Sequence, residues 1–231
     1  MLSLAKNAAR TSKKHIAIFS MEMSNEQVVQ RLISQETGID SQRLRLGKLT
    51  EHEWELFTEA VDSFSRTRIF LDDTPAISPT QMRAKCRRLH LEHRLDLVIV
   101  DYLQLMRGDQ YNDNRVQEVS NISRNLKVLA RELNVPVLAA AQLSRAVEQR
   151  ADKKPILSDL RESGSLEQDA DIVMFIYRED KDNPDSPMKN VTEIIISKHR
   201  NGPTGSAKLV FREELAQFVD AEMRYTDVSE I

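Results

Sequence analysis

Three side chains that can do chemistry follow short apolar segments of this chain. Glu22 follows the segment KHIAIFS, Asp101 follows Leu97 to Val100, and Gln142 follows VPVLAAA. Carboxylates bind cations or accept protons, and an amide both donates and accepts hydrogen bonds. Apolar, β-branched runs of this length are typical of strands buried in a parallel sheet. Because ligands of open α/β sheets bind at the carboxyl ends of the strands, we expect the three polar groups at one such edge.

Asp101 is the residue on which this interpretation depends. At the end of a buried strand it would meet a nucleotide-bound Mg²⁺. The alternative is a strand-end aspartate that caps the next loop, and the segment Leu95 to Met106 alone does not separate the two. The alternative for Glu22 is an acid that interacts with the dipole of the helix after it. Gln142 could be a buried amide that satisfies backbone groups.

Apolar periodicity and turn signals predict the elements that would position these groups. Ser24, three residues before Gln27, is a capping-box start, and Gly38 is a helix stop. Helices are predicted over residues 1–10, 24–38, 49–65, 80–93 and 116–133, and we interpret the stripe of Trp54, Phe57, Val61 and Phe64 as core packing. Strands are predicted over 14–20, 69–73, 97–100, 135–141 and 171–177, with an antiparallel pair at 191–197 and 207–211 and a short strand ending at Phe218.

Composition bounds the class of protein. The chain has 231 residues, 40% hydrophobic and 30% charged, which suits one α/β domain. A net charge of -3 shows no overall basic surplus for nucleic acid, although a local basic loop would not appear in the sum. The single Cys86 excludes an internal disulfide and is interpreted as a structural thiol in a reducing compartment. No apolar run approaches a membrane span and no export signal is apparent, so we expect no membrane partner.

Two charged segments remain after this assignment. Residues 146–169 form a long segment interrupted by Pro155 and Gly164, which predicts a loop that is either functional or disordered. The turn KHRNGPTGS joins the antiparallel pair and carries Lys198 and Arg200. The alternative for both is an ordinary solvated surface.

Five stretches in order resemble the C-terminal motor domain of replicative DNA helicases of the DnaB type: FSMEMSNEQVVQRL, DLVIVDYLQLM, AAQLSRAVEQR, LRESGSLEQDADIV and ISKHRNGPTG. The resemblance covers almost the whole chain. It implies an α/β, RecA-like fold, with a mainly parallel sheet flanked by helices and a C-terminal antiparallel strand pair. One such domain would span residues 1–220, followed by a polar tail at 221–231.

The same resemblance implies an enzyme, an ATP-dependent 5′-to-3′ helicase that uses ATP and Mg²⁺. It would act as a homo-hexamer on single-stranded DNA, with a primase and a helicase loader as partners, in the cytoplasm at a bacterial replisome or in a plastid. Asp101 matches the Walker B acid, which holds Mg²⁺ through water. Glu22 matches the catalytic glutamate that polarises the attacking water, and Gln142 matches the polar sensor of the γ-phosphate.

The resemblance also assigns roles to the two charged segments. Arg200 matches the arginine finger, with Lys198 beside it, and both would reach the nucleotide of the adjacent subunit. Arg161, Glu162 and Gly164 match the loop that grips the backbone of single-stranded DNA.

One departure from the family pattern matters. The sequence contains no Gly-rich loop ending in Lys-Thr or Lys-Ser, and MLSLAKNAAR resembles the helix that follows that loop. We therefore expect the first strand and the phosphate loop to be missing, and the chain alone to bind ATP poorly and not to unwind DNA. The competing interpretations are a RecA-like module that binds single-stranded DNA or a partner without hydrolysis, and a recombination-type ATPase of the wider RecA superfamily.

Overall fold

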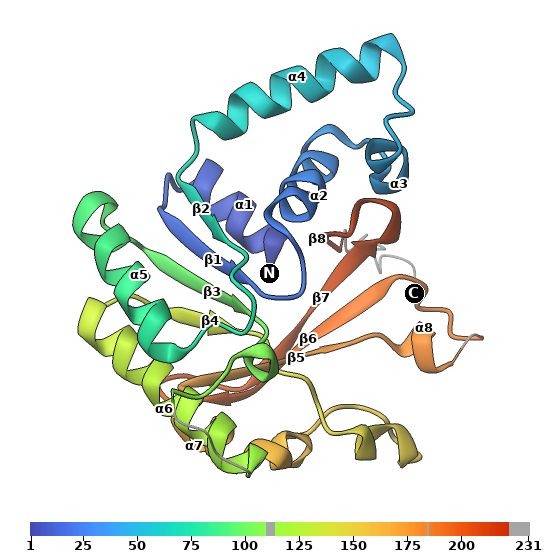
Figure 1. The fold of residues 1–231 in the computed structure, drawn as a ribbon. Helices are drawn as coiled ribbons and strands as arrows, with labels where there is room; N and C mark the ends of the chain where they lie inside the picture. Colours follow the sequence, from blue (N-terminus) through green and yellow to red (C-terminus); the bar gives the residue numbers. More distant parts are fainter. Residues whose placement is uncertain (110–113, 184, 222–231) are drawn as a thin grey trace.

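Figure 1 shows two sheets side by side with helices around them. The computed structural model describes residues 1–109, 114–183 and 185–221. One sheet is parallel, with strand order β2-β1-β3-β4, and the other is antiparallel, with strand order β5-β6-β7-β8. The strands are β1 Ile16–Ser20, β2 Ile69–Asp72, β3 Leu97–Asp101, β4 Val137–Ala139, β5 Ile172–Tyr177, β6 Val191–His199, β7 Gly205–Arg212 and β8 Gln217–Asp220.

The helices begin and end at local signals. Ser24, Thr50 and Ser78 each form a capping box at the start of a helix, and Gly38, with φ of 73°, ends α2 in the left-handed conformation. The α-helices are α1 Leu2–Arg10, α2 Asn25–Thr37, α3 Ser41–Arg45, α4 Glu51–Ser65, α5 Pro79–His93, α6 Arg115–Leu133, α7 Gly164–Asp169 and α8 Glu179–Asp182. Short 3-10 helices are η1 Leu103–Leu105, η2 Arg145–Gln149, η3 Leu157–Ser163 and η4 Glu213–Leu215.

Strand β3 lies inside the parallel sheet and is buried on both faces. Val98 and Val100 pack with Ile122 of α6 on one side, and Ile99 packs with Ala5 of α1 on the other. The three β3 side chains are all 0% exposed. This confirms the prediction of a doubly covered strand, with helices on both faces of a parallel sheet.

The antiparallel part of the fold is larger than the predicted pair. The pairing of β6 with β7 is confirmed, with Ile194 opposite Ala207. Strand β5 pairs along the other edge of β6, and β8 pairs with β7, so four strands form this sheet. Both added pairings join strands that are consecutive in the chain, but a strand pattern alone does not determine which strands pair or in which register.

The prediction that the α4 stripe is core packing is wrong for two of its residues. Phe57 and Phe64 pack in a cluster with Ala60 and with residues of α2 and α3. Trp54 is 49% exposed and Val61 is 43% exposed. In Figure 1, α4 lies at the top of the molecule, outside α2 and α3, so only one side of this helix is covered.

The segment predicted as one long loop has more structure than expected. Its described backbone forms η2, η3 and α7. The predicted tail from residue 221 lies outside the described residues except for Ala221. Cys86 is fully buried, and this burial raises the pKa of its thiol to about 12, which fits a structural role. Across the described ranges, no helix has the length and apolar character needed to cross a bilayer.

Gln35 of α2 ties the antiparallel sheet to the helices beside the parallel one. Its Nε2 donates to the carbonyl oxygen of Ala216, 2.8 Å away, and its Oε1 accepts from the Ser3 hydroxyl at 3.3 Å. Its own carbonyl oxygen accepts from Lys6 Nζ at 2.9 Å and from Gln217 Nε2 at 3.2 Å. Gln35 therefore joins α1, α2 and the start of β8 at one buried point.

We predict that Gln35→Ala lowers the free energy of unfolding by about 2–4 kcal/mol, because the Ala216 carbonyl and the Ser3 hydroxyl lose their partner in a mostly buried junction. Gln30→Ala, on the same helix but half-exposed, is the matched control and should cost well under that amount. Urea denaturation of both variants measures the difference. Equal losses would mean that the junction does not hold the two sheets together.

Candidate active site

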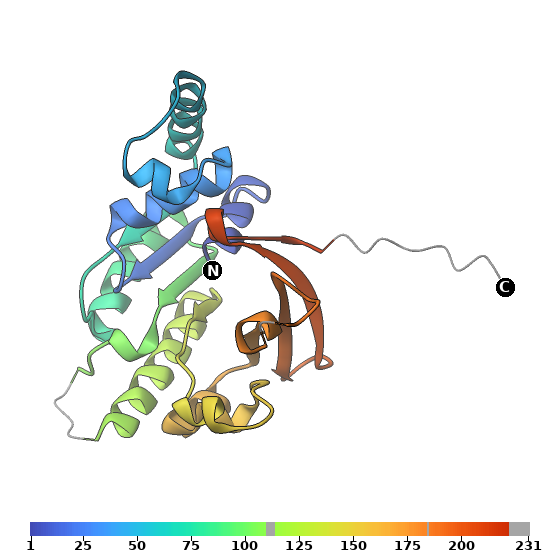
Figure 2. The ribbon, with the colours of Figure 1, turned by 90° about the vertical axis from the view of Figure 1, so that its right-hand side faces the viewer.

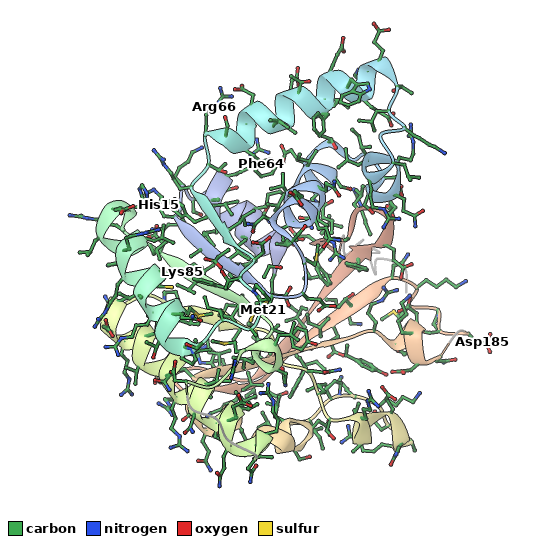
Figure 3. The ribbon with its side chains drawn as sticks, viewed as in Figure 1. His15, Met21, Phe64, Arg66, Lys85 and Asp185 are labelled. Carbon is green, nitrogen blue, oxygen red and sulfur yellow. The ribbon has the colours of Figure 1, made fainter. Side chains whose placement is uncertain are left out.

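The carboxyl ends of β1 and β3 lie side by side. Ser20 is opposite Asp101 in the parallel ladder, and the Met21 N–H donates to the Asp101 carbonyl oxygen at 3.0 Å. The Ser20 hydroxyl donates to the Met23 carbonyl oxygen at 2.8 Å and closes the turn that carries Glu22. Glu22 is exposed on this turn, and Figure 3 labels its neighbour Met21. The structure therefore brings the Glu22 and Asp101 segments together, as the strand pattern predicts.

Helix α1 begins at the same edge. The amine of Met1 is largely buried, and this burial lowers its pKa, while the carboxylate of Asp101 acts on it in the opposite sense. The N-terminus lies beside the carboxyl ends of β1 and β3 in Figures 1 and 2. Asp101 is half-buried, and the peptide bond to Tyr102 is cis. A helix N-terminus presents backbone N–H groups, which favour an anion such as phosphate.

The backbone of Gln142 is held next to this edge by Gln104, a residue that sequence reasoning missed. Gln104 Nε2 donates to the Gln142 carbonyl oxygen, and Gln104 Oε1 accepts from the Gln142 N–H, both at 3.1 Å. The Leu103 N–H donates to the Ala140 carbonyl oxygen at 3.0 Å and continues the contact between the two strand ends. Gln142 is exposed, which rules out the alternative of a buried amide. The available signal was the position of Gln104, three residues after Asp101.

The N-terminal turns of α6 hold the loop that follows Asp101. Arg115 donates to the Gln104 carbonyl oxygen at 2.6 Å, and Glu118 accepts from the Gly108 N–H at 2.7 Å. Burial raises the pKa of Glu118, but hydrogen bonds from Gly108 and Arg115 outweigh it and leave this pKa below its usual value. The described segment from Gln104 to Gly108 is thus held at both of its ends.

Lys198 and Arg200 do not lie at this edge. Lys198 Nζ donates to the carbonyl oxygens of Glu167 and Gln168, and the Arg200 guanidinium pairs with Asp171 at 3.2 Å. In Figure 1 the turn between β6 and β7 lies beside α6 and α7, away from the carboxyl ends of β1 and β3. The Arg200 side chain is 47% exposed, so it remains accessible to another molecule.

The backbone of the predicted DNA-binding residues is helical. Arg161 and Glu162 lie in η3, and Gly164 begins α7. Their side chains lie outside the described part of the structure. The preceding segment is organised by the buried Asp159, which sequence reasoning also missed. Its carboxylate accepts two hydrogen bonds from Arg150, at 3.1 and 2.9 Å, and one from the Ile156 N–H at 2.8 Å.

The donor set at the β1–β3 edge suits a cation that arrives with a nucleotide. In the described ranges no group of three His, Cys, Asp or Glu side chains forms a metal cage. Mg²⁺ usually binds through one or two carboxylates, waters and substrate phosphates. Asp101 can supply such a carboxylate, and exposed Glu22 can act on a water molecule beside it.

Known proteins resemble this chain in sequence and in fold. The family model described as DnaB-like helicase C terminal domain matches residues 1–220. The chain is 53% identical over 227 residues to the replicative DNA helicase DnaB of Geobacillus stearothermophilus, covering 98% of this chain and 50% of that protein. The chain thus spans about half the length of this relative.

Two solved structures share the fold. One, described as an ATPase domain, matches with a TM-score of 0.90 and 38% identity, over 96% of this chain and 80% of that one. A DnaB-like replicative helicase, solved to describe its interactions with primase, matches with a TM-score of 0.91 and 40% identity, over 96% of this chain and 54% of that one. The RecA-like α/β class expected from the sequence is confirmed.

We predict that Gln104→Ala accelerates hydrogen exchange at the Gln142 amide on the order of tenfold, because that amide loses its acceptor. Gln104→Glu keeps an acceptor oxygen and is the matched control, so exchange at Gln142 should stay close to the original rate. Amide exchange followed by NMR measures both. Unchanged exchange in Gln104→Ala would show that other contacts hold this segment.

Proposed function

The chain belongs to the DnaB-like helicase C terminal domain family, and from that premise we propose that it is the ATP-dependent motor domain of a replicative DNA helicase. The observation that carries this proposal is the pairing of Ser20 with Asp101, which puts Glu22 and Asp101 on adjacent strand ends beside the start of α1. The nucleotide would bind at this edge, with its phosphates near the N-terminus of α1.

Each residue at the edge has a distinct role in the proposal. Asp101 would hold Mg²⁺, which when bound would supply positive charge to offset that of the nucleotide phosphates. Glu22, exposed on its turn, polarises the water that attacks the γ-phosphate. Gln142 contacts the γ-phosphate, and Gln104 positions it through its backbone. In this proposal Gln104 is a positioning residue, because its contacts are with the Gln142 backbone.

Lys198 and Arg200 act on the nucleotide of a neighbouring subunit. Their separation from Asp101 in one chain and the exposure of Arg200 support this role. Lys198 lies near the end of β6, and Arg200 begins the turn after it. That turn is tight, since a Cβ at Gly202 would lie 3.0 Å from ring atoms of His199. A guanidinium on such a turn can stabilise the charge that spreads over the γ-phosphoryl group. The role requires an oligomer, and we propose a homo-hexameric ring.

The ring would translocate 5′ to 3′ on single-stranded DNA. Arg161, Glu162 and Gly164 would line its channel and contact the phosphate backbone, which makes binding insensitive to sequence and weaker at high salt. A solved relative is described with its interactions with primase. We propose a primase and a helicase loader as partners of this protein also, at the replisome of a bacterial cell.

The chain spans about half the length of its relative, and we propose that further polypeptide of a full-length protein would complete the site. Among the described strands, β4 is an edge strand of the parallel sheet and β5 is an edge strand of the antiparallel sheet. Ile172, Met174 and Ile176 of β5 are 45%, 45% and 58% exposed. A strand from the rest of a full-length protein would pair between β4 and β5 and cover part of these side chains. A Gly-rich phosphate loop after that strand would then reach the start of α1.

We predict that single-turnover ATP hydrolysis with single-stranded DNA and Mg²⁺ is weak for residues 1–231. It should be strong for a chain extended by this strand and loop. In the extended chain, Arg200→Ala should slow hydrolysis by roughly 10³-fold or more, because an arginine finger acts on the transition state. Arg212→Ala, an exposed arginine on β7, is the matched control and should leave the rate unchanged. An extended chain that binds DNA without hydrolysis would replace this proposal with a binding module.

Mixing two inactive variants of the extended chain tests action between subunits. An Arg200→Ala subunit keeps its own Asp101, and an Asp101→Asn subunit keeps its own Arg200. If Arg200 acts in trans, some interfaces in mixed rings combine an intact site with an intact finger, so hydrolysis should partly return. No recovery in rings shown by native mass spectrometry to be mixed would contradict the trans role.

A further inference from the structure

A cavity of about 640 Å³ lies at the amino end of β1, opposite to the candidate active site. The end of α1, the loop from Thr11 to His15 and the chain after α4 form its walls. Figure 3 labels His15 and Arg66 on this side of the molecule, away from Met21. Its volume is in the range of small-molecule sites.

The cavity is strongly basic although the whole chain carries a net charge of -3. Its walls contain one carboxylate, that of Glu36, which pairs with both Lys6 and Arg10. Burial, and then the positive charge of Arg10, lower the pKa of Lys6. The cationic side chains in the walls are Lys6, Arg10, Lys13, Lys14, Arg66 and Arg68.

Ion pairs and interaction with a helix dipole explain only some of the cationic side chains in the cavity walls. Lys14 pairs with Asp96 at 2.9 Å, and Arg66 pairs with Asp62 at 2.8 Å. Arg10 lies in the last turn of α1, where a cation complements the helix dipole. Lys13 and Arg68 lie beyond the helix ends, and no carboxylate of the described ranges pairs with either of them.

The backbone around these two cations is fixed. The Lys14 N–H donates to the Ala8 carbonyl oxygen at 3.1 Å, which folds the loop back on α1. The Ile16 N–H donates to the Arg68 carbonyl oxygen at 2.9 Å, which holds the other wall against β1. Lys13 has a φ of 54°, a conformation that side-chain-bearing residues adopt at some cost. Both cations are therefore presented from walls that do not need to rearrange.

We propose that this cavity binds a small polyphosphate anion, such as inorganic triphosphate or the phosphate chain of a free nucleotide. Clustered cations on a fixed frame match closely spaced negative charges. Single-stranded DNA fits less well, because its sites combine a basic groove with aromatic side chains, and the cavity walls contain no Trp, Tyr or Phe. Helix α1, roughly 13 Å long, separates the cavity from the proposed nucleotide site. The inference therefore does not depend on hydrolysis.

The test is calorimetric titration of residues 1–231 with sodium triphosphate, at fixed ionic strength and without Mg²⁺. The double variant Lys13→Gln with Arg68→Gln should raise the dissociation constant by roughly tenfold or more, because two charge-assisted contacts are lost. Arg45→Gln with Lys189→Gln removes the same charge from exposed positions elsewhere and should leave the constant unchanged. No binding, or equal weakening in both double variants, would overturn the proposal.

Two further experiments test where the anion binds and whether the cavity binds nucleic acid instead. In the unmodified chain, triphosphate should shift the NMR amide signals of residues 11–15 and 66–68. Shifts confined to residues 20–23 and 101–104 would assign the anion to the other edge and overturn the proposal. A single-stranded oligonucleotide should bind equally well to both double variants. If it depends on Lys13 and Arg68 while triphosphate does not bind, the cavity is a nucleic-acid contact and the proposal is wrong.

Discussion

The parallel pairing of β1 with β3 is the constraint on which the rest of this structure depends. Ser20 lies opposite Asp101, and the Met21 N–H reaches the Asp101 carbonyl oxygen. A slip by one residue would turn every side chain of the strand to the other face. Such a slip is opposed on both faces, because Val98, Ile99 and Val100 are all fully buried between helices. Packing in the interior therefore determines the positions of Glu22 and Asp101 at the carboxyl ends of the strands.

Strand β1 separates a region of carboxylates at its carboxyl end from a region of cationic side chains at its amino end. Its carboxyl end carries Glu22 and meets Asp101, whereas its amino end follows Lys13 and Lys14 and lies against Arg68. Helix α1 runs between the two regions, since its first residues approach Asp101 and its last turn lines the basic cavity. A phosphate ligand at either end would meet different groups. Carboxylates need a cation to approach phosphate, whereas the lysines and arginines can bind it directly.

The antiparallel sheet determines where the exposed Arg200 side chain lies on the molecule. Strand β5 pairs with β6, so Lys198 near the end of β6 contacts the end of α7, and Arg200 after it pairs with Asp171. Gln35 anchors the other end of this sheet to α1 and α2 through the carbonyl of Ala216. The two sheets are thus held in one arrangement, while the arginine expected to act in catalysis faces outward. An exposed cation at that position is consistent with a site shared between subunits.

The sequence by itself determined the features that depend on near neighbours. The Ser24 capping box, the Gly38 stop, the buried strands and the polar residues after them follow from local periodicity and local hydrogen bonds. Only the tertiary structure decided that Gln104 holds Gln142, that Trp54 faces solvent and that β5 belongs to the antiparallel sheet. It also decided that cations from α1, from the next loop and from the chain after α4 meet in one cavity. These features join segments far apart in the chain, and their contacts form only when the whole core packs.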